Sequence, residues 1–375
     1  MTLRRGGFRW ADLPSILEDL PASGGTAREE PEDFIVREVP AYEPSGHGSH
    51  FYMHIRKRNL TTRDVVKAFV AHGISESRIG VAGLKDKHAV TEQWLSVPWS
   101  QHDDARRALE ALDGTEILQE SRHKNKLGVG HLHGNHFTLR IRDASDAQVK
   151  AASERFQALT QRGVPNYFGP QRFGRYGGNV EDGLKLLDGA QVSGDHRLKR
   201  FFLSAVQSWL FNRVLALRIE EGLFFGLTDG DWARKHETGG TFKVEDPASE
   251  IPRVQHAEIS ALIPLHGKKV RMSDGHAGEL EAQAFGELGV RWAQLATRRG
   301  DRRLSRVLLT NPSFEAEENG YTLAFQLPKG SYATAVLREV TSQPVDEPTV
   351  PQDEVKVDAL TTVSQAKRPS GKTRH

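Results

Sequence analysis

The sequence predicts an α+β protein, and two kinds of pattern lead to that fold class. Apolar residues alternate with polar ones at several places between Phe34 and about Arg142, and again over 321–327. A period of two is typical of strands that bury one face. Between these regions, apolar residues recur at helical spacing over 145–163 and 203–217. We therefore expect a mixed α+β domain made from both chain ends and interrupted by a middle domain.

The strand signal is clearest at 51–55 and 137–141, where every second residue is apolar. The next element is expected to be a helix, because apolar residues beyond Ser145 are spaced three or four positions apart. Ser145 and Gln148 can form a capping box, and Gly163 can end the last turn. We expect this helix to run from Ser145 to Gly163.

A glycine-rich segment follows at 166–179, and a second helix is expected over 203–217, before Gly222. The interval 225–285 is rich in Gly, His and turn signals. It predicts hairpins.

The end of the sequence has a different composition from the rest. From Gln343 onward it contains four prolines and no aromatic residue, and an acidic first half precedes a basic end. Such a segment buries too little apolar surface to order itself. We expect a disordered tail over 343–375.

Composition narrows the class of protein. The 375 residues contain 51 Lys and Arg against 49 Asp and Glu, and they contain no Cys. The missing cysteine excludes disulfides, thiol nucleophiles, Fe–S clusters and Cys-type zinc sites, and it favours a cytoplasmic protein. The apolar stretch at 201–211 is too short and too polar to cross a bilayer, so we expect neither a membrane span nor an N-terminal signal.

The segment at 83–93, which reads Gly-Leu-Lys-Asp-Lys-His-Ala-Val-Thr-Glu-Gln, is the first candidate for chemistry. Asp86 stands between Lys85 and Lys87, before a strand-like stretch. Flanking cations keep a carboxylate ionised even when a ligand expels water, which suits a nucleophile or a base. The alternative is a solvated charged turn, which composition alone favours.

A second candidate is the histidine-rich segment at 131–137. His131 and His133 would share a strand face, and imidazoles two positions apart can bind one metal ion. A zinc site needs further ligands, and the sequence does not indicate any. We therefore expect no metal.

Three basic clusters have aromatic residues nearby, and they lie at 122–126, 167–176 and 298–306. Arginine binds phosphates and aromatic rings stack on bases, so this combination favours RNA. In a helix, Arg298, Arg302 and Arg306 would lie one turn apart and form a basic stripe that faces a phosphate backbone. Arg172 is a further candidate for a backbone contact. The alternative for the stripe is a solvated helix face.

Five motifs together carry a family resemblance. They are Pro-Glu-Asp-Phe-Ile-Val-Arg-Glu at 31–38, the segment at 83–93, Gly-Asn-His-Phe at 134–137, Asn-Tyr-Phe-Gly-Pro-Gln-Arg-Phe-Gly at 166–174 and Leu-Pro-Lys-Gly-Ser-Tyr-Ala-Thr at 327–334. In order and spacing they resemble the TruD family of tRNA pseudouridine synthases, from about Thr26 to Glu339. Several long motifs that match in order are far more specific than one.

The resemblance implies a fold and an activity. A pseudouridine-synthase catalytic domain with a mixed, mostly antiparallel sheet would be discontinuous, over 1–160 and 307–342. An inserted α/β domain, the TRUD domain, would occupy 161–306, and RNA would bind in the cleft between the two domains. Family members isomerise uridine to pseudouridine, typically at position 13 of tRNA, without cofactor or metal. We accordingly expect an isomerase whose partner is tRNA, with no protein partner evident.

The resemblance also implies residue roles. Asp86 would be the nucleophile, Phe34 and Asn135 would contact the uridine, Phe137 would stack on its ring and Tyr332 would close the pocket. Arg28 stands where the family commonly has Lys, and Tyr332 where Phe is common. Arg28 can still pair with Asp86, bidentately if geometry allows, whereas the added hydroxyl of Tyr332 needs a partner. Plain core packing is the alternative for the three aromatic residues.

Two rival functions stay open. A non-catalytic RNA-binding or RNA-chaperone protein would keep the RNA surface without the chemistry, and the intact Lys85-Asp86 pair argues against it. A carboxylate hydrolase would need a second acid close to Asp86. Glu92 is a candidate, but an odd-even count along a strand puts it on the same side about six positions away, too far for a tight dyad.

Overall fold

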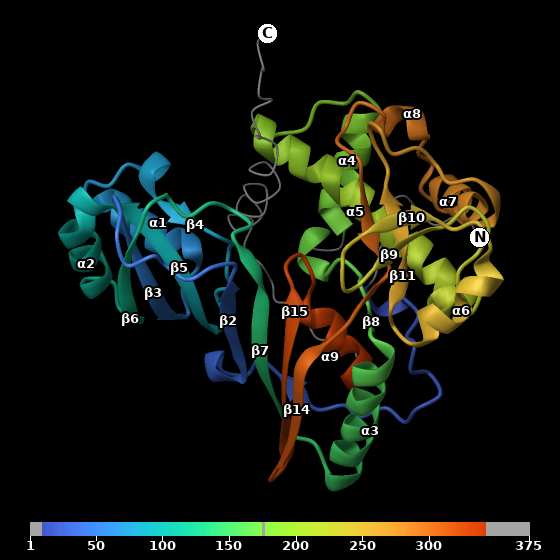
Figure 1. The fold of residues 1–375 in the computed structure, drawn as a ribbon, viewed down its shortest axis with the longest axis horizontal. Helices are drawn as coiled ribbons and strands as arrows, with labels where there is room; N and C mark the ends of the chain where they lie inside the picture. The colour runs from blue at the N-terminus through green and yellow to red at the C-terminus, as the bar shows by residue number, and fades with distance from the viewer. Residues whose placement is uncertain (1–9, 175–176, 343–375) are drawn as a thin grey trace. The chain divides into compact units, whose positions relative to one another are not determined.

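The computed structural model describes residues 10–174 and 177–342 (Figure 1). These residues form two compact units. The sheet unit comprises residues 25–144 and 311–330, and the helix-rich unit comprises residues 10–24, 145–310 and 331–342. The domain limits and the RNA-binding cleft expected from the resemblance stay predictions, and the tail expected at 343–375 lies outside the described residues.

The sheet unit is built around one mixed sheet, which has nine strands over the described residues. The strands are β1 (Thr26–Ala27), β2 (Phe34–Pro40), β3 (His50–Arg58), β4 (Gly80–Val81), β5 (Val90–Pro98), β6 (Thr115–His123), β7 (Leu132–Arg142), β14 (Thr310–Glu317) and β15 (Gly320–Pro328). Two helices of this unit are α1 (Thr62–Ala71) and α2 (His102–Glu110).

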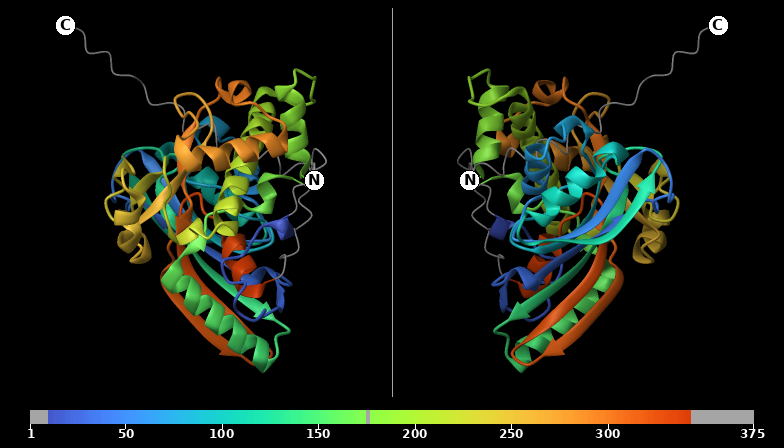
Figure 2. Two further views of the ribbon diagram at one scale, coloured as in Figure 1. Left: turned by 90° about the vertical axis from the view of Figure 1, so that its right-hand side faces the viewer. Right: turned by 90° about the vertical axis from the view of Figure 1, so that its left-hand side faces the viewer.

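The strand order is β14-β15-β7-β2-β5-β3-β6, with β1 paired to β7 and β4 paired to β5. Strands β2 and β5 run parallel, whereas the pairs of β7 with β1, β2 and β15 and those of β3 and β4 with their neighbours are antiparallel. Strands β7 and β15, far apart in the sequence, run side by side (Figures 1 and 2). The expected sheet, mixed, mostly antiparallel and built from both chain ends, is therefore confirmed.

The alternation at 51–55 is confirmed as the buried face of β3. Phe51, Met53 and Ile55 are almost fully buried in one apolar cluster with residues of α1 and α2. Burying each such side chain contributes about 1.5–3 kcal/mol. Helix α1 begins at a capping box, in which the Thr61 N–H donates to Asp64 Oδ2 (2.8 Å) and the Asp64 N–H donates to Thr61 Oγ1 (3.1 Å).

The helix-rich unit contains seven α-helices and six strands over its described residues. The helices are α3 (Asp146–Arg162), α4 (Gly178–Leu187), α5 (His196–Glu220), α6 (Pro247–Gln255), α7 (Gly275–Leu288), α8 (Trp292–Leu295) and α9 (Ala333–Thr341). The strands are β8 (Val164–Pro165), β9 (Trp232–Lys235), β10 (Thr241–Lys243), β11 (Ile259–Leu265), β12 (Asp301–Leu304) and β13 (Arg306–Val307), which pairs with β8.

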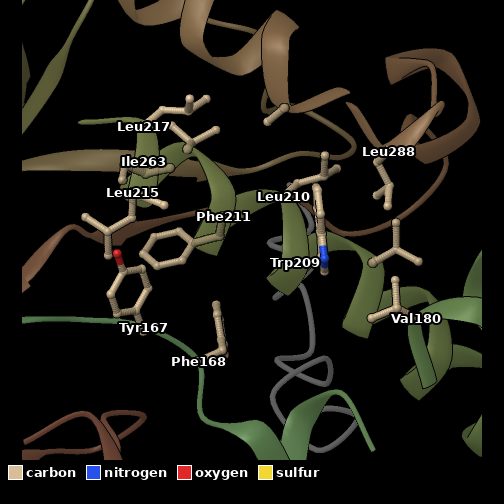
Figure 3. Close-up of a cluster of buried hydrophobic side chains, with 14 of the residues drawn as sticks. Tyr167, Phe168, Val180, Trp209, Leu210, Phe211, Leu215, Leu217, Ile263 and Leu288 are labelled. Atoms are coloured by element: carbon tan, nitrogen blue, oxygen red, sulfur yellow. The ribbon is translucent and has the colours of Figure 1, made fainter. Parts of the chain in front are cut away.

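Both helices expected in this unit are present. Helix α3 has the capping box at Ser145, and Gly163 ends it with a φ of 78°. Helix α5 is longer than expected because Asp195 caps its start, accepting from the N–H groups of Arg197 and Leu198. Its apolar side chains form the centre of the unit's core (Figure 3).

The interval 225–285 was expected to form hairpins, and this expectation is partly wrong. Strands β9 and β10 form one antiparallel hairpin, but α6 and α7 occupy much of the rest. In α7, Leu280, Ala284 and Leu288 are four positions apart and buried in the core around α5. That helical spacing outweighs the turn-forming composition of the segment.

A membrane span was not expected, and the described part of the chain contains no helix that is both long and apolar enough to cross a bilayer.

Candidate active site

Asp86 lies in the loop between β4 and β5, and its side chain is 36% exposed, so a ligand can reach the carboxylate. The sequence count that compared Asp86 with Glu92 assumed that both lie on one strand. This assumption was wrong, because β5 begins only at Val90. Glu92 instead forms ion pairs with Arg37 (3.5 Å) and Arg56 (3.0 Å). Its carboxylate is thus already engaged by two arginines.

One face of the sheet, here called the site face, can be followed by strand register. Phe137 on β7 pairs with Val36 on β2, Val36 pairs with Thr91 on β5, and Thr91 pairs with Lys57 on β3. Residues in register on neighbouring strands point to the same face. Phe34 and Asn135, two positions from members of this row, share the face. The site face therefore carries three of the residues that the resemblance assigned to uridine binding.

Arg28 connects the aromatic part of the site to Asp86. Its guanidinium carbon lies 3.7 Å from the centroid of the Phe34 ring, and its Nη2 lies 4.0 Å from Asp86 Oδ2. That distance is too long for a hydrogen bond, so the bidentate pairing considered for Arg28 is not formed. Burial lowers the pKa of Arg28, and the attraction of Asp86 opposes this shift. Arg28 also has a φ of 63°, which is uncommon for a residue with a side chain.

The aromatic residues of the site face are buried. The rings of Phe34 and Phe137 meet edge to face with centroids 6.2 Å apart, and Phe137 also contacts Phe325 of β15 at 5.6 Å. Phe137 is 7% exposed. The ring positions are thus set by packing, and their contact with a uridine stays a prediction.

Asn135 follows Gly134, a residue at which strand β15 comes close to β7. A side-chain carbon on the preceding residue, Gly134, would lie 2.0 Å from the carbonyl oxygen of Leu327, so only glycine lets β15 pair here. Asn135 Oδ1 is buried and, within the described part of the chain, has no hydrogen-bond partner. Thr91 Oγ1 and Gln93 Nε2 on β5 share this property. Buried polar atoms in native proteins are nearly always paired, so each of these exceptions calls for a partner.

The loop that carries Asp86 is attached to the sheet unit at several points. Lys85 Nζ donates to Glu38 Oε2 at 2.7 Å in a buried ion pair, and the Lys85 N–H donates to Thr62 Oγ1 at 2.9 Å. Lys57 Nζ donates to the carbonyl oxygen of Asp86 at 3.2 Å. The sequence reasoning gave no role to Lys57, Glu38 or Thr62. Glu38 is the last residue of the motif at 31–38, and its place in that motif is the sequence signal that could have identified it.

Tyr332 and Arg172 belong to the helix-rich unit. Tyr332 precedes α9, and its ring centroid lies 6.0 Å from that of Phe168. Arg172 donates from Nε to Ser208 Oγ (3.2 Å), and its guanidinium lies over Phe168 and Phe201. Their roles in closing a pocket and in RNA binding stay predictions.

The helix expected to align Arg298, Arg302 and Arg306 is not formed. Arg298 lies in a bend, Arg302 is in β12 and Arg306 is in β13. Strand β12 pairs with β11, and this pairing overrides the local helical spacing. Arg306 is 1% exposed and donates to Ser260 Oγ and to the carbonyls of Val254 and Ile259. The three arginines therefore form no helical stripe, and Arg306 is a core residue.

His131 precedes β7, and its Nδ1 lies 2.8 Å from the hydroxyl oxygen of Tyr42. Over residues 10–174 and 177–342, no group of three or more His, Asp or Glu side chains is arranged to hold a metal ion.

The fold is similar to that of a solved structure. A crystal structure from Methanosarcina mazei, assigned to tRNA pseudouridine synthase D (TruD), superposes with a TM-score of 0.69 at 24% identity and covers 89% of this chain and 97% of that one. The chain therefore shares the fold of that structure.

Sequence comparison agrees. The profile of the family tRNA pseudouridine synthase D (TruD) matches residues 12–189 and 185–340. A tRNA pseudouridine synthase D from Thermus thermophilus is 46% identical over 334 residues, which is 89% of this chain and 93% of the relative. One from Anaeromyxobacter dehalogenans is 45% identical over 348 residues, 90% and 98% of the two chains. The chain belongs to the TruD family.

Proposed function

We propose that the protein is a tRNA pseudouridine synthase that isomerises uridine 13 of tRNA, with Asp86 as the nucleophile. Membership of the TruD family supports the reaction class. The observation that carries the residue assignment is the placement of Asp86: a partly exposed carboxylate beside the buried Arg28 guanidinium, in a loop anchored above the site face. A fixed carboxylate near a cation stays ionised and can attack.

The reaction conserves all atoms of the nucleoside. The bond from C1′ to N1 breaks, the uracil turns, and a bond from C1′ to C5 forms, while the proton on C5 leaves and N1 takes one up. No electrons are gained or lost. A carboxylate that attacks the ribose or the base during this exchange supplies the covalent step. The partner is tRNA, and the cytoplasm is the proposed place of action because tRNA is there.

The target uridine must leave its stack before it can react, at a cost of a few kcal/mol. Contact with Phe34 and Phe137 offsets part of this cost, since stacking contributes about 1–3 kcal/mol per base. The amide of Asn135 offers one acceptor and two donors, which match the imide N–H and the carbonyls of uracil. The unpaired Oδ1 would then accept from the N3–H of the base.

A base-resolved pseudouridine map of tRNA treated with the purified protein tests the proposal. We expect one modified position, uridine 13, and no product on a transcript with cytidine there. Asp86→Asn should abolish turnover and leave tRNA affinity within about twofold, because the amide keeps the shape but not the anion. The exposed Asp113 provides the matched control, Asp113→Asn. Binding without any pseudouridine by the wild type would instead support the non-catalytic RNA-binding alternative.

A further inference from the structure

Lys57 is a lysine with no exposed surface, and it lies directly beneath the loop that carries Asp86. Its ammonium group donates to two main-chain carbonyl oxygens, those of Leu60 and Asp86. Leu60 immediately precedes the capping box of α1, whereas Asp86 belongs to a different loop. One side chain therefore joins the start of a helix to the main chain of the proposed nucleophile.

We propose that Lys57 is a positioning residue for the isomerisation. It holds the carbonyl group of Asp86, so that the Asp86 carboxylate keeps a fixed position relative to the site face. The inference rests on the proposed role of Asp86. Lys57 does not itself contact the substrate in this scheme, because its amine is buried under the loop. It acts through the carbonyl of Asp86.

Two other attachments hold different parts of the loop. Thr62 Oγ1 accepts from the Lys85 N–H and donates to Gln93 Oε1 (2.8 Å), so it holds the peptide between Leu84 and Lys85, one peptide before the one that joins Lys85 to Asp86. The Lys85–Glu38 pair fixes a side chain. Lys57 Nζ donates to the carbonyl of Asp86 itself, in the peptide that follows the reacting residue. The main chain is thus held at the Lys85 N–H before Asp86 and at the carbonyl of Asp86 itself, which restricts movement of the main chain around Asp86.

The cost of burying this amine also points to a function. Burial lowers the pKa of Lys57 to about 7, although the attraction of Asp86 raises it again in part. A neutral side chain of similar length would avoid this desolvation cost. We therefore infer that the two hydrogen bonds of Lys57 serve to position the Asp86 loop, and not to raise the stability of the fold.

Lys57→Met tests the proposal because it keeps the length and removes the donor. We expect single-turnover rates on tRNA to fall by about 10- to 100-fold, since a misplacement of about 1 Å can cost that much. The tRNA dissociation constant should stay within about twofold. Hydrogen exchange should rise in a peptide spanning the Asp86 loop but not in the strands beside it. Lys67→Met, at an exposed position of α1, is the matched control and should leave rate and exchange unchanged.

A chemical rescue keeps the test decisive if Lys57→Met folds poorly. The chain contains no cysteine, so a Lys57→Cys protein can be alkylated at that position alone, in denaturant, and then refolded. Alkylation with 2-bromoethylamine restores an amine of nearly lysine length, whereas iodoethane adds carbon without a donor. We expect the aminoethylated protein to be about tenfold or more faster than the ethylated one. Equal rates for the two, or a folded Lys57→Met protein within about twofold of wild type, would overturn the role of Lys57.

These outcomes separate this inference from the proposed function. If Asp86→Asn turns over like wild type, the assignment of the nucleophile fails, whatever Lys57 does. If Asp86→Asn is inactive while Lys57→Met is folded and fully active, the nucleophile stands and the positioning role alone is wrong.

Discussion

The guanidinium of Arg28 lies over the Phe34 ring, with its central carbon 3.7 Å from the ring centroid. The pair is buried, and it directs one end of the guanidinium toward Asp86 at 4.0 Å. An aromatic face attracts a cation that lies over it. Phe34 therefore sets the position of the charge that faces the proposed nucleophile.

This relationship predicts an order of activities at position 28. Arg28→Lys, which keeps a charge but loses the guanidinium over the ring, should reduce turnover by about tenfold, and Arg28→Met by about 100-fold. Phe34→Leu should resemble Arg28→Lys because it removes the ring that orients the guanidinium. Single-turnover assays on tRNA measure this order, with the exposed Arg78→Met as control. If Arg28→Met is as fast as Arg28→Lys, charge at this position has no part in the reaction.

Asn135→Leu should separate stability from activity. Its Oδ1 is buried without a partner in the described part of the chain, so replacing the amide with an apolar side chain removes a desolvation cost. We expect the free energy of unfolding to stay the same or to rise by about 1 kcal/mol. The value of kcat/KM should fall by about 10- to 100-fold, because the base loses its hydrogen bonds. Urea unfolding and initial rates measure the two quantities, and Asn125→Leu, at an exposed position, is the control. A variant with lower stability and unchanged kcat/KM would show that Asn135 is structural.

The lowered pKa of Lys57 predicts a pH-dependent stability with a defined sign. Between about pH 7 and the ordinary lysine value of 10.5, the unfolded chain holds a proton that the native protein has lost. Stability then rises with pH by up to about 1.4 kcal/mol per pH unit from this group. Asp86, Lys85 and Asp64 are the charged groups that act on it. Lys57→Met should show a smaller rise than wild type in urea unfolding between about pH 7 and about pH 9, and parallel curves would mean that Lys57 stays charged throughout.

His236 predicts a pH effect in the helix-rich unit. Ser260 Oγ accepts from Arg306 Nε (2.9 Å), so its own proton is free to donate to His236 Nε2 (2.8 Å), which requires a neutral imidazole. Burial and two nearby arginines lower the pKa of His236 from 6.5 to about 4. Stability should thus fall as the pH drops from 6.5 toward 4, because the unfolded chain gains the proton first. His236→Gln should reduce this fall in unfolding measurements. An unchanged pH dependence would show that the pKa of His236 is the same in the native and the unfolded protein.

Arg306→Met should destabilise the protein. The variant removes four hydrogen bonds from a buried guanidinium, including those to the carbonyls of Val254, Ile259 and Arg162. Losing them leaves buried acceptors unpaired, at a cost of roughly 2–5 kcal/mol. The exposed Arg299→Met is the control, with a change below about 0.5 kcal/mol. Denaturant midpoints of the variant and wild type measure this loss of stability. Equal midpoints would show that the four hydrogen bonds of Arg306 do not stabilise the fold, and Arg306 would again be a candidate for phosphate contact.

Local elements were predictable because their signals lie within a few residues. Ser145, Gln148 and Gly163 set the two ends of α3 through contacts that the chain makes with itself. The alternation at 51–55 required one buried face, whichever partner covered it. The proposed nucleophile and its neighbours were identified through the family motifs, and the structure adds the distances between Arg28, Phe34 and Asp86.

The sequence by itself determined the α+β class, the capped helix α3, the alternating strands and the segments in which the candidate residues stand. Tertiary structure decided what no local pattern contains. Residues Asp301–Leu304 became strand β12 because β11 offered a partner, and Arg306 became a core residue through three segments that converge on it. Lys57 is placed under Asp86 because β3 pairs with β5. Such positions depend on contacts between residues distant in the chain, and the free energy of these contacts outweighs local preference.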